Sequence, residues 1–356
     1  MMKVIRFTRY RALAITLSLL VIVAGGVATF FQGGFNLGID FRAGLTERVA
    51  VAPSVSASIE DVRRALAGIP GVQVQTIGDP EAQEFLIKVK EEEGAENFRE
   101  TTRTAILSAL SAAFGEGNVE ERSSQYIGPR FSESIASQSF LLVLVAIFFM
   151  LVYIWFRFQL AYAVGAITAL FHDVFVLLGV IGAFQLEVST ATIAAILTIV
   201  GYSINDTIVV FDRIRENTQL LKERPFREIV DGSITQTLSR TLITSLTTLL
   251  AVLAIYIFTT GDIKLFAFNL IVGILVGTYS SIFIASPVMM WIRNARHREE
   301  EEMKEQRQQV LSVKEETGPP AEETGGGEPE EKGEGGGVQI VQGRRRLPRS
   351  KRKKKR

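Results

Sequence analysis

Three charged residues lie well inside long apolar stretches of this 356-residue sequence. Asp173 follows His172 in one stretch, Asp206 follows Asn205 in the next, and Arg240 lies near the start of a third. An ionisable group inside a membrane costs about 2.5–3.5 kcal/mol on insertion scales, so it usually has a partner and a function. A buried carboxylate beside a guanidinium that can approach or withdraw can take up and release a proton. The chemistry that these residues predict is proton transfer within a membrane.

The spacing of Asp206 and Arg240 predicts that they lie opposite each other. The two stretches that hold them must be antiparallel, and both residues are about equally far from a basic loop centred near Lys222 and Glu223. They should therefore lie at similar depth, where pairing would offset much of the cost of burial. Polar residues at helical spacing that could line a narrow hydrated path between the two stretches are Thr198, Tyr202, Asn205, Thr237, Thr241, Thr244 and Thr248.

Two plainer interpretations of these polar residues stay open on the sequence alone. Asp206 and Arg240 could be an assembly pair that only holds two helices together. His172 could relay protons, or it could simply be hydrogen-bonded in the interior. The proton interpretation gives coupling roles to Asp206, Arg240, Asp173, His172 and Asn205.

The composition excludes several kinds of catalysis. The chain has no Cys, so disulfides, thiolate zinc sites and thiol nucleophiles are excluded. It has no Gly-x-x-x-x-Gly-Lys-Ser/Thr phosphate loop and no His-Glu-x-x-His zinc motif, and its two His, His172 and His297, are far apart. We therefore expect a protein that is not an enzyme, with no catalytic residue, no cofactor and no metal site.

Six stretches are long and apolar enough to cross a membrane. A bilayer core about 30 Å thick needs about 20 apolar residues in a helix. The first stretch could instead be a cleaved signal peptide, because basic residues precede it, but its length exceeds the usual apolar run of about 7–15 residues and predicts an uncleaved anchor. The six predicted transmembrane helices cover 12–31, 135–156, 160–184, 190–211, 238–258 and 265–291.

The short loops predict the orientation of these helices. Lys and Arg in short loops stay on the cytoplasmic side of a membrane. They occur before the first span, between the second and third, between the fourth and fifth, and after the sixth, whereas loops 185–189 and 259–264 hold one basic residue between them, Lys264. Both termini are therefore expected in the cytoplasm.

The segment between the first two spans is long enough to be a domain on the outer side. Its pattern predicts strands at 46–51, 72–77, 85–90 and 118–126, and helices at 59–67 and 97–114. The order βαββαβ is that of a ferredoxin-like α+β domain. The longer helix is expected to bury Phe98, Ala105, Leu107 and Leu110. The predicted divisions are 1–32 (cytoplasmic start and first helix), 33–134 (outer domain), 135–292 (five helices) and 293–356 (cytoplasmic tail).

The net charge of +1 conceals a strongly basic end. Of the 39 Lys and Arg residues in the chain, ten lie within residues 344–356. The rest of the chain therefore has 29 basic residues and 38 acidic ones. Residues 299–314 predict a charged helix, and the Gly-, Glu- and Pro-rich stretch 318–337 predicts a flexible linker. The basic tail could bind anionic lipid, could contact ribosomal RNA, or could be a solvated tether.

Several motifs in order resemble the SecF group of the SecD/SecF family, within the RND superfamily. The likeness covers about residues 1–298 and departs at Arg42-Ala43-Gly44, where the family usually has a small residue and two glycines. The stretches that carry it are FNLGIDF at 35–41, FHDVF at 171–175, GYSINDTIVVFDRIREN at 201–217 and SRTLIT at 239–244.

This resemblance implies a six-helix RND-type permease half with one ferredoxin-like outer domain, in the bacterial inner membrane. It implies a proton-driven accessory of Sec protein export whose partners are SecD, a SecYEG-type translocon, a YajC-like subunit and exported preproteins. It implies that Asp206 and Arg240 form the proton-linked pair. The signature residues that it marks after the first span are Gly38, Ile39, Asp40 and Phe41.

Two other functions stay open. A subunit of an RND-type exporter of small molecules would use the same machinery for another substrate class, and it predicts larger outer domains. A scaffold that only holds partners together predicts that Asp206→Asn is tolerated.

Overall fold

The computed structural model describes residues 4–78, 80–91 and 97–316. The chain divides into two compact units, residues 1–300 and 301–356. The fold below is that of the first unit. Of the second unit, the described residues 301–316 are helical, as the sequence predicted for 299–314, and they complete α9 (Ser286–Glu316). The predicted linker at 318–337 and the basic tail lie outside the described residues.

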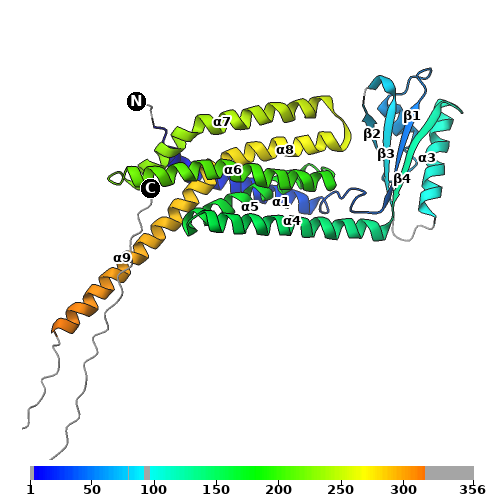
Figure 1. The fold of residues 1–356 in the computed structure, drawn as a ribbon. Coiled ribbons are helices and arrows are strands. Elements are labelled where there is room, and N and C mark those ends of the chain that lie inside the picture. Colours follow the sequence, from blue (N-terminus) through cyan, green and yellow to red (C-terminus); the bar gives the residue numbers. More distant parts are fainter. Residues whose placement is uncertain (1–3, 79, 92–96, 317–356) are drawn as a thin grey trace, which may run out of the picture. The chain divides into compact units, whose positions relative to one another are not determined.

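Six helices within the described residues are long and apolar enough to cross a membrane, as the sequence predicted. In chain order they are α1 (Arg11–Phe31), α4 (Pro129–Arg157), α5 (Leu160–Ala183), α6 (Thr190–Leu220), α7 (Phe226–Phe258) and α8 (Gly261–Ser280), which continues through a π turn, Ser281–Ala285, into α9 (Figure 1).

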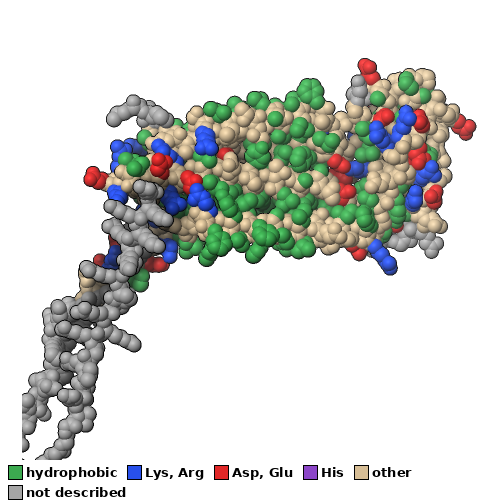
Figure 2. All heavy atoms as spheres, in the orientation of Figure 1, with side chains coloured by type: hydrophobic (Ala, Val, Ile, Leu, Met, Phe, Trp, Pro, Cys, Tyr) green, Lys and Arg blue, Asp and Glu red, His purple; other side chains and the backbone are tan. Residues whose placement is uncertain are grey.

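Several of these helices extend past their apolar stretches. α4 begins at Pro129, α6 runs on to Leu220 and α7 begins at Phe226, so polar turns are added at helix ends. A short 3-10 segment, Phe7–Tyr10, precedes α1 and was not predicted. These ends carry charged side chains that favour water, whereas the middle of each helix is apolar. Figure 2 shows hydrophobic side chains over the surface of the bundle and Lys and Arg gathered at one end.

The helices differ in how much they bury within this chain. α5, α6 and α8 bury a large share of their most apolar windows, whereas α4 and α7 bury very little of theirs. Leu13 and Leu20 on α1, Phe149 on α4 and Leu250 on α7 are exposed. The three central helices are therefore the ones in which polar side chains can be kept from lipid.

The packing of α1 against α5 depends on a glycine pair. A Cβ atom at Gly25 would lie 2.7 Å from Cα of Gly179, closer than real atoms approach. Gly26, the next residue, has nothing within 4 Å of its Cβ position. Small residues let two membrane helices approach at backbone distance, where van der Waals contact supplies the attraction.

Gly25→Val is expected to separate α1 from α5, whereas Gly26→Val should be tolerated. Overpacking a tight contact typically costs about 1–3 kcal/mol. Thermal unfolding of the full chain in mild detergent, followed by protease resistance of α1, should show a lower midpoint for the Gly25 variant alone. Equal midpoints for the two variants would contradict the assigned helix contact.

The soluble domain between α1 and α4 is ferredoxin-like, as predicted. Its sheet has the order β2-β3-β1-β4 with every neighbouring pair antiparallel, and the core lies between the sheet and its two helices. The elements are β1 (Gly44–Val51), α2 (Ile59–Ala65), β2 (Gln73–Ile77), β3 (Glu84–Lys90), α3 (Phe98–Phe114) and β4 (Val119–Ile127).

The buried residues were predicted well for the strands and less well for α3. Phe85, Ile87 and Val89 of β3 are buried together, as their spacing indicated. The buried face of α3 consists of Thr102, Ile106, Leu110 and Phe114, whereas Ala105 is exposed. The prediction for Ala105 was therefore wrong: four-residue spacing through Ile106 gives the larger apolar stripe, and Leu107 and Phe98 only border it.

One carboxyl group faces this core. Glu47 in β1 is completely buried; it accepts a hydrogen bond from Ser124, but its Oε2 atom has no partner among the described residues. Burial raises the pKa of Glu47, and the Ser124 hydrogen bond offsets only part of this effect. Because its folded pKa is raised above the unfolded one, Glu47 supports folding below its unfolded pKa and ceases to do so as pH rises through the folded pKa.

Glu47→Gln is therefore expected to stabilise the soluble domain at pH 7 by about 1 kcal/mol, because the amide carries no charge to bury. At pH 4, where Glu47 itself is protonated, the gain should vanish. Hydrogen exchange of β1 amides in the full chain, compared at the two pH values, measures this difference. A gain of the same size at both pH values would show that the ionised carboxylate is not the cause.

Candidate proton site and its connection to the soluble domain

Asp206 lies at the centre of a polar cluster formed by three helices. Its α6 side chain is 8% exposed, and Ser245 of α7 donates to its Oδ2 at 3.3 Å. Ser245 also shares a 2.7 Å hydrogen bond with Thr278 of α8. Asp206 therefore contacts α7 directly and α8 through one hydroxyl group.

A small cavity adjoins this cluster. Its volume of about 30 Å³ exceeds the roughly 10–15 Å³ that one water needs. The carboxyl group of Asp206 can thus be hydrated while the surrounding helices stay packed. The lining residues are Tyr202, Ser203, Asn205, Asp206, Thr244, Ser245, Gly273, Ile274, Gly277 and Thr278.

Arg240 does not form the direct pair with Asp206 that the sequence suggested. Its guanidinium makes no hydrogen bond or ion pair within the described part of the chain, and its side chain is exposed, although it is near enough to interact electrostatically with Asp206. Ser245 takes the place opposite Asp206. Arg240 precedes Ser245 by five residues, which is about 140° around a helix and about 7.5 Å along it. Asp206 and Arg240 are each 14 residues from the ends of the loop at Leu220 and Phe226, so equal distances along the two helices did not place their side chains in contact.

The second intramembrane carboxylate, Asp173, has a complete set of partners. It is 1% exposed and sits on α5. Ser203 of α6 and Ser280 of α8 both donate to its Oδ2, the latter at 2.8 Å, while Nδ1 of His172 lies 2.9 Å from its Oδ1. Asp173 therefore ties the three central helices together.

The surroundings of Asp173 and Asp206 share one wall. Ser203 lines the cavity beside Asp206 and also donates to Asp173. At Gly277, which lines the same cavity, a Cβ atom would lie 3.2 Å from Cβ of Ser203 and 3.7 Å from Oδ2 of Asp173. A side chain at Gly277 would therefore press on Ser203, the residue that the two surroundings share.

His172 and Asn205 complete the set of predicted coupling residues. The Nε2 atom of His172 is buried without a hydrogen-bond partner among the described residues, and its ring centre lies 6.2 Å from that of Tyr279. Asn205 is exposed on α6 and lines the Asp206 cavity. The structure thus brings Asp206, Asn205, Asp173 and His172 into one region, with Arg240 nearby but unpaired.

The signature residues after α1 connect the soluble domain to the bundle. The amide of Gly38 donates to the carbonyl of Val188 at 2.9 Å, and a Cβ atom at Gly38 would lie 2.5 Å from Glu187. Asp40 accepts from the amide and the hydroxyl of Thr190, each at 2.9 Å, at the start of α6. A carboxylate at that position caps the helix and suits its dipole.

A buried ion pair makes a second connection. Lys88 of β3 is 6% exposed at its side chain and lies 3.3 Å from Glu187, just before α6, and 2.9 Å from Asp262, at the start of α8. Burial alone would lower the pKa of Lys88, but the two carboxylates outweigh it and the pKa is raised. One ammonium group thus holds the soluble domain to the starts of α6 and α8.

Sequence reasoning did not identify several residues of this site. Ser203, Ser280, Ser245 and Thr278 look like ordinary hydroxyls in apolar helices, where they commonly bond to the preceding turn. Lys88 alternates with core residues in β3 and so was expected to point away from the core, but no pattern indicated its partners. Only Ser203, three residues before Asp206, lies within one helical turn of a predicted carboxylate, and Ser245, Thr278 and Ser280 carry no such signal.

Known proteins resemble this chain over most of its length. The model of the family described as "Protein export membrane protein SecD/SecF, C-terminal" matches residues 106–295. "Protein translocase subunit SecF" of Borreliella burgdorferi is 39% identical over 82% of this chain and 98% of its own. "Protein translocase subunit SecDF" of Thermus thermophilus is 39% identical over 79% of this chain and 38% of its own.

A solved structure agrees with these sequence relatives. The crystal structure of SecDF from Thermus thermophilus, described as a translocon-associated membrane protein, superposes with a TM-score of 0.68 at 37% identity, over 82% of this chain and 39% of that one. The family match, the identity across nearly the whole of a curated relative and the shared fold lead to one assignment: the chain belongs to the SecD/SecF family of protein-export membrane proteins.

Proposed function

We propose that this chain is a proton-coupled accessory subunit of the Sec protein translocation machinery that acts with SecD. Its relatives are named protein translocase subunits, and in SecDF relatives the matching region is one part of a longer chain. Association with a SecD protein follows from that fusion. The observation that carries the proton role is Asp206, a buried membrane carboxylate beside a cavity between three helices.

The geometry supplies a way for proton transfer to move the soluble domain. Protonated Asp206 needs only Ser245 and a water, whereas the ionised carboxylate attracts Arg240 toward the cavity. Each exchange alters how α7 and α8 meet α6, because Ser245 is bonded to both Asp206 and Thr278. The outer ends of α6 and α8 hold Lys88 of the soluble domain through Glu187 and Asp262.

The proposed setting is the inner membrane of a bacterium, with both termini in the cytoplasm. Arg157 pairs with Asp212 at 2.6 Å, Arg224 lines one cavity with Arg6 and Arg9 of the segment before α1, and Arg293 lies over the ring of Phe226 at the start of α7. A basic end favours the cytoplasmic side. In this arrangement residues 33–134 lie outside, where exported polypeptide emerges. A SecYEG-type translocon and a YajC-like subunit are the further partners that we propose, and the chain itself is not an enzyme.

The size of the cavity disfavours export of small molecules through this chain. Ligand pockets usually measure about 300–1,000 Å³. The cavity at Asp206 measures about 30 Å³, enough for water and protons. A polypeptide that passes outside the bundle is compatible with this limit.

The test is export in vesicles that contain this chain, its SecD partner and the translocon. An imposed proton gradient should speed the later, ATP-independent movement of a preprotein, and a protonophore should remove the effect. If the rate does not change with the gradient, coupling to protons is wrong even if the complex assembles. If no complex with SecD is recovered, the assignment to export with that partner is wrong.

A further inference from the structure

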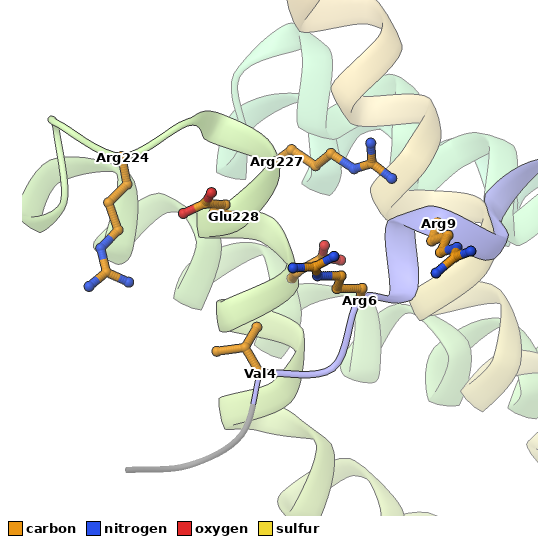
Figure 3. Close-up of a pocket in the computed structure, with 7 residues that line it drawn as sticks. Val4, Arg6, Arg9, Arg224, Arg227 and Glu228 are labelled. Atoms are coloured by element: carbon orange, nitrogen blue, oxygen red, sulfur yellow. The ribbon is translucent and has the colours of Figure 1, made fainter.

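A cavity of about 780 Å³ lies at the basic end of the bundle, away from the proton site. Arg6 and Arg9 reach it from the segment before α1, and Arg224 and Arg227 reach it from the start of α7 (Figure 3). This size falls within the roughly 300–1,000 Å³ typical of ligand sites. Nothing in the proposed proton mechanism uses these four side chains.

The arginines have unused hydrogen-bonding capacity. Within the described residues, the guanidinium groups of Arg6, Arg9 and Arg224 make no hydrogen bond and no ion pair, whereas Arg157 and Arg213 at the same end are paired with Asp212 and Glu216. A guanidinium carries five donors and cannot lose its charge. These exposed groups can donate charge-assisted hydrogen bonds to an anion that enters the cavity.

The carboxylates near the cavity do not neutralise it. Both oxygens of Asp231 accept hydrogen bonds from Thr8, from its amide at 2.9 Å and its hydroxyl at 2.8 Å. Glu228 is the other acidic lining residue. Four guanidinium groups and two carboxylates leave the cavity with an excess of positive charge.

The cavity is also built on a fixed frame. Thr8 is 2% exposed and Asp231 is 5% exposed, so their hydrogen bonds are shielded from water. The hydroxyl of Thr8 accepts from Nε of Arg227 at 2.8 Å, and the amide of Ile5 donates to Thr235 at 3.1 Å. The segment before α1 is therefore held against α7, which keeps the arginines from both elements together before any ligand binds.

We infer that this arginine cavity binds a phosphate group, supplied by the headgroup of an anionic phospholipid. Arginine forks match phosphate oxygens in geometry and charge. Exposed apolar side chains accompany the arginines in this segment: Val4, which lines the cavity, is 49% exposed, and Tyr10 and Leu13, which follow Arg9 along the chain into α1, are 56% and 70% exposed. A ligand with acyl chains can cover these residues while its phosphate meets the arginines, which free phosphate cannot do. Basic pockets on the cytoplasmic side of membrane helices commonly hold lipid headgroups.

The test counts lipids on the purified full-length protein by native mass spectrometry. Phosphatidylglycerol should remain bound where phosphatidylcholine does not. Arg9→Gln with Arg224→Gln removes two guanidinium groups that support no other contact in the described structure, so folding is preserved. This variant should bind phosphatidylglycerol about 30-fold more weakly, at about a fivefold loss for each basic residue.

The matched control is Lys222→Gln with Arg298→Gln, which removes two exposed charges that do not line the cavity. The control should keep wild-type affinity. Equal weakening of both variants would mean that general surface charge attracts the lipid, and the inference would fail.

Competition by inorganic phosphate distinguishes a lipid headgroup from free phosphate as the ligand. If phosphate binds in the cavity but phosphatidylglycerol does not, the ligand is the free anion and the lipid assignment is wrong. Loss of binding only in the cavity variant, with little competition by phosphate, supports the lipid.

Discussion

Asp206→Asn is expected to abolish the acceleration of export by a proton gradient while the chain stays folded and bound to its partner. Each proton that crosses 100 mV delivers about 2.3 kcal/mol. An amide keeps the shape of the carboxyl group and can accept from Ser245, but it cannot exchange a proton in the working pH range. Export with the variant should therefore fall to the rate seen without a gradient.

The matched control is Asp212→Asn, on the same helix. Asp212 pairs with Arg157 at 2.6 Å, and 41% of its side chain is exposed. Because an exposed pair contributes only about 0–1 kcal/mol, this variant should retain acceleration. Arg240→Met should behave like Asp206→Asn if the guanidinium completes the proton cycle. Wild-type export by both Asp206→Asn and Arg240→Met, under a full gradient, would leave a scaffold as the better description.

Infrared difference spectroscopy examines the same residue without export. A change of pH across the membrane should alter the band of a protonated carboxylic acid, and that change should be missing in Asp206→Asn. A spectrum that is identical in both proteins would show that Asp206 does not change its protonation state.

The depth of Asp206 was predictable, but its partner was not. A carboxylate surrounded by apolar residues over a whole span is visible in the sequence, and burial in the structure agrees with it. The pairing with Arg240 relied on a symmetric hairpin. α6 ends at Leu220 and α7 begins at Phe226, so the residue count is symmetric, yet the side chain that contacts Asp206 is Ser245. A shift of a few residues is invisible in a sequence yet exchanges one partner for another.

The soluble domain shows the same division between local and long-range information. Alternation and helix caps were enough to predict its elements, because Ser58 and Asp61 form a capping box and Phe85, Ile87 and Val89 alternate. The contact of Lys88 with Glu187 spans 99 residues, and that with Asp262 spans 174. No periodic pattern joins residues so distant, so the connection to the membrane helices required three-dimensional structure.

The signature residues after α1 were marked by the sequence, but their role was not explained by it. Resemblance marked Gly38 and Asp40 without giving a physical reason. The structure supplies one, because Gly38 leaves room for Glu187 and Asp40 caps the helix that carries Asp206. Asp40, which looks like part of a linker in the sequence, thus helps to fix the position of the start of α6.

Lys88→Met is expected to release the soluble domain from the helices and to stop proton-driven export although Asp206 is intact. The ammonium group is buried beside Glu187 and also contacts Asp262, whose side chain is 43% exposed, and removing one partner of a buried pair typically costs about 3–5 kcal/mol. Because the pKa of Lys88 is raised, its charge and this stabilisation persist at neutral pH and are lost only as pH rises through that folded pKa. Faster hydrogen exchange in β3 and at the start of α8 should accompany the loss of export.

A double variant separates an uncompensated charge from a lost connection. In Lys88→Met with Glu187→Met no charge remains buried at that contact, so stability should largely recover, as it does when both partners of a buried pair become apolar. If export by the double variant recovers together with stability, any firm contact at this position transmits movement. If only stability recovers, the ion pair itself must open and close during the proton cycle.

Arg48→Met is the control in the same sheet, because its pair with Glu84 is 43% exposed on the arginine side and should contribute about 1 kcal/mol or less to stability. Wild-type export by Lys88→Met, with β3 exchanging faster, would show that force reaches the soluble domain by another route, for which the Gly38–Val188 and Asp40–Thr190 contacts are candidates.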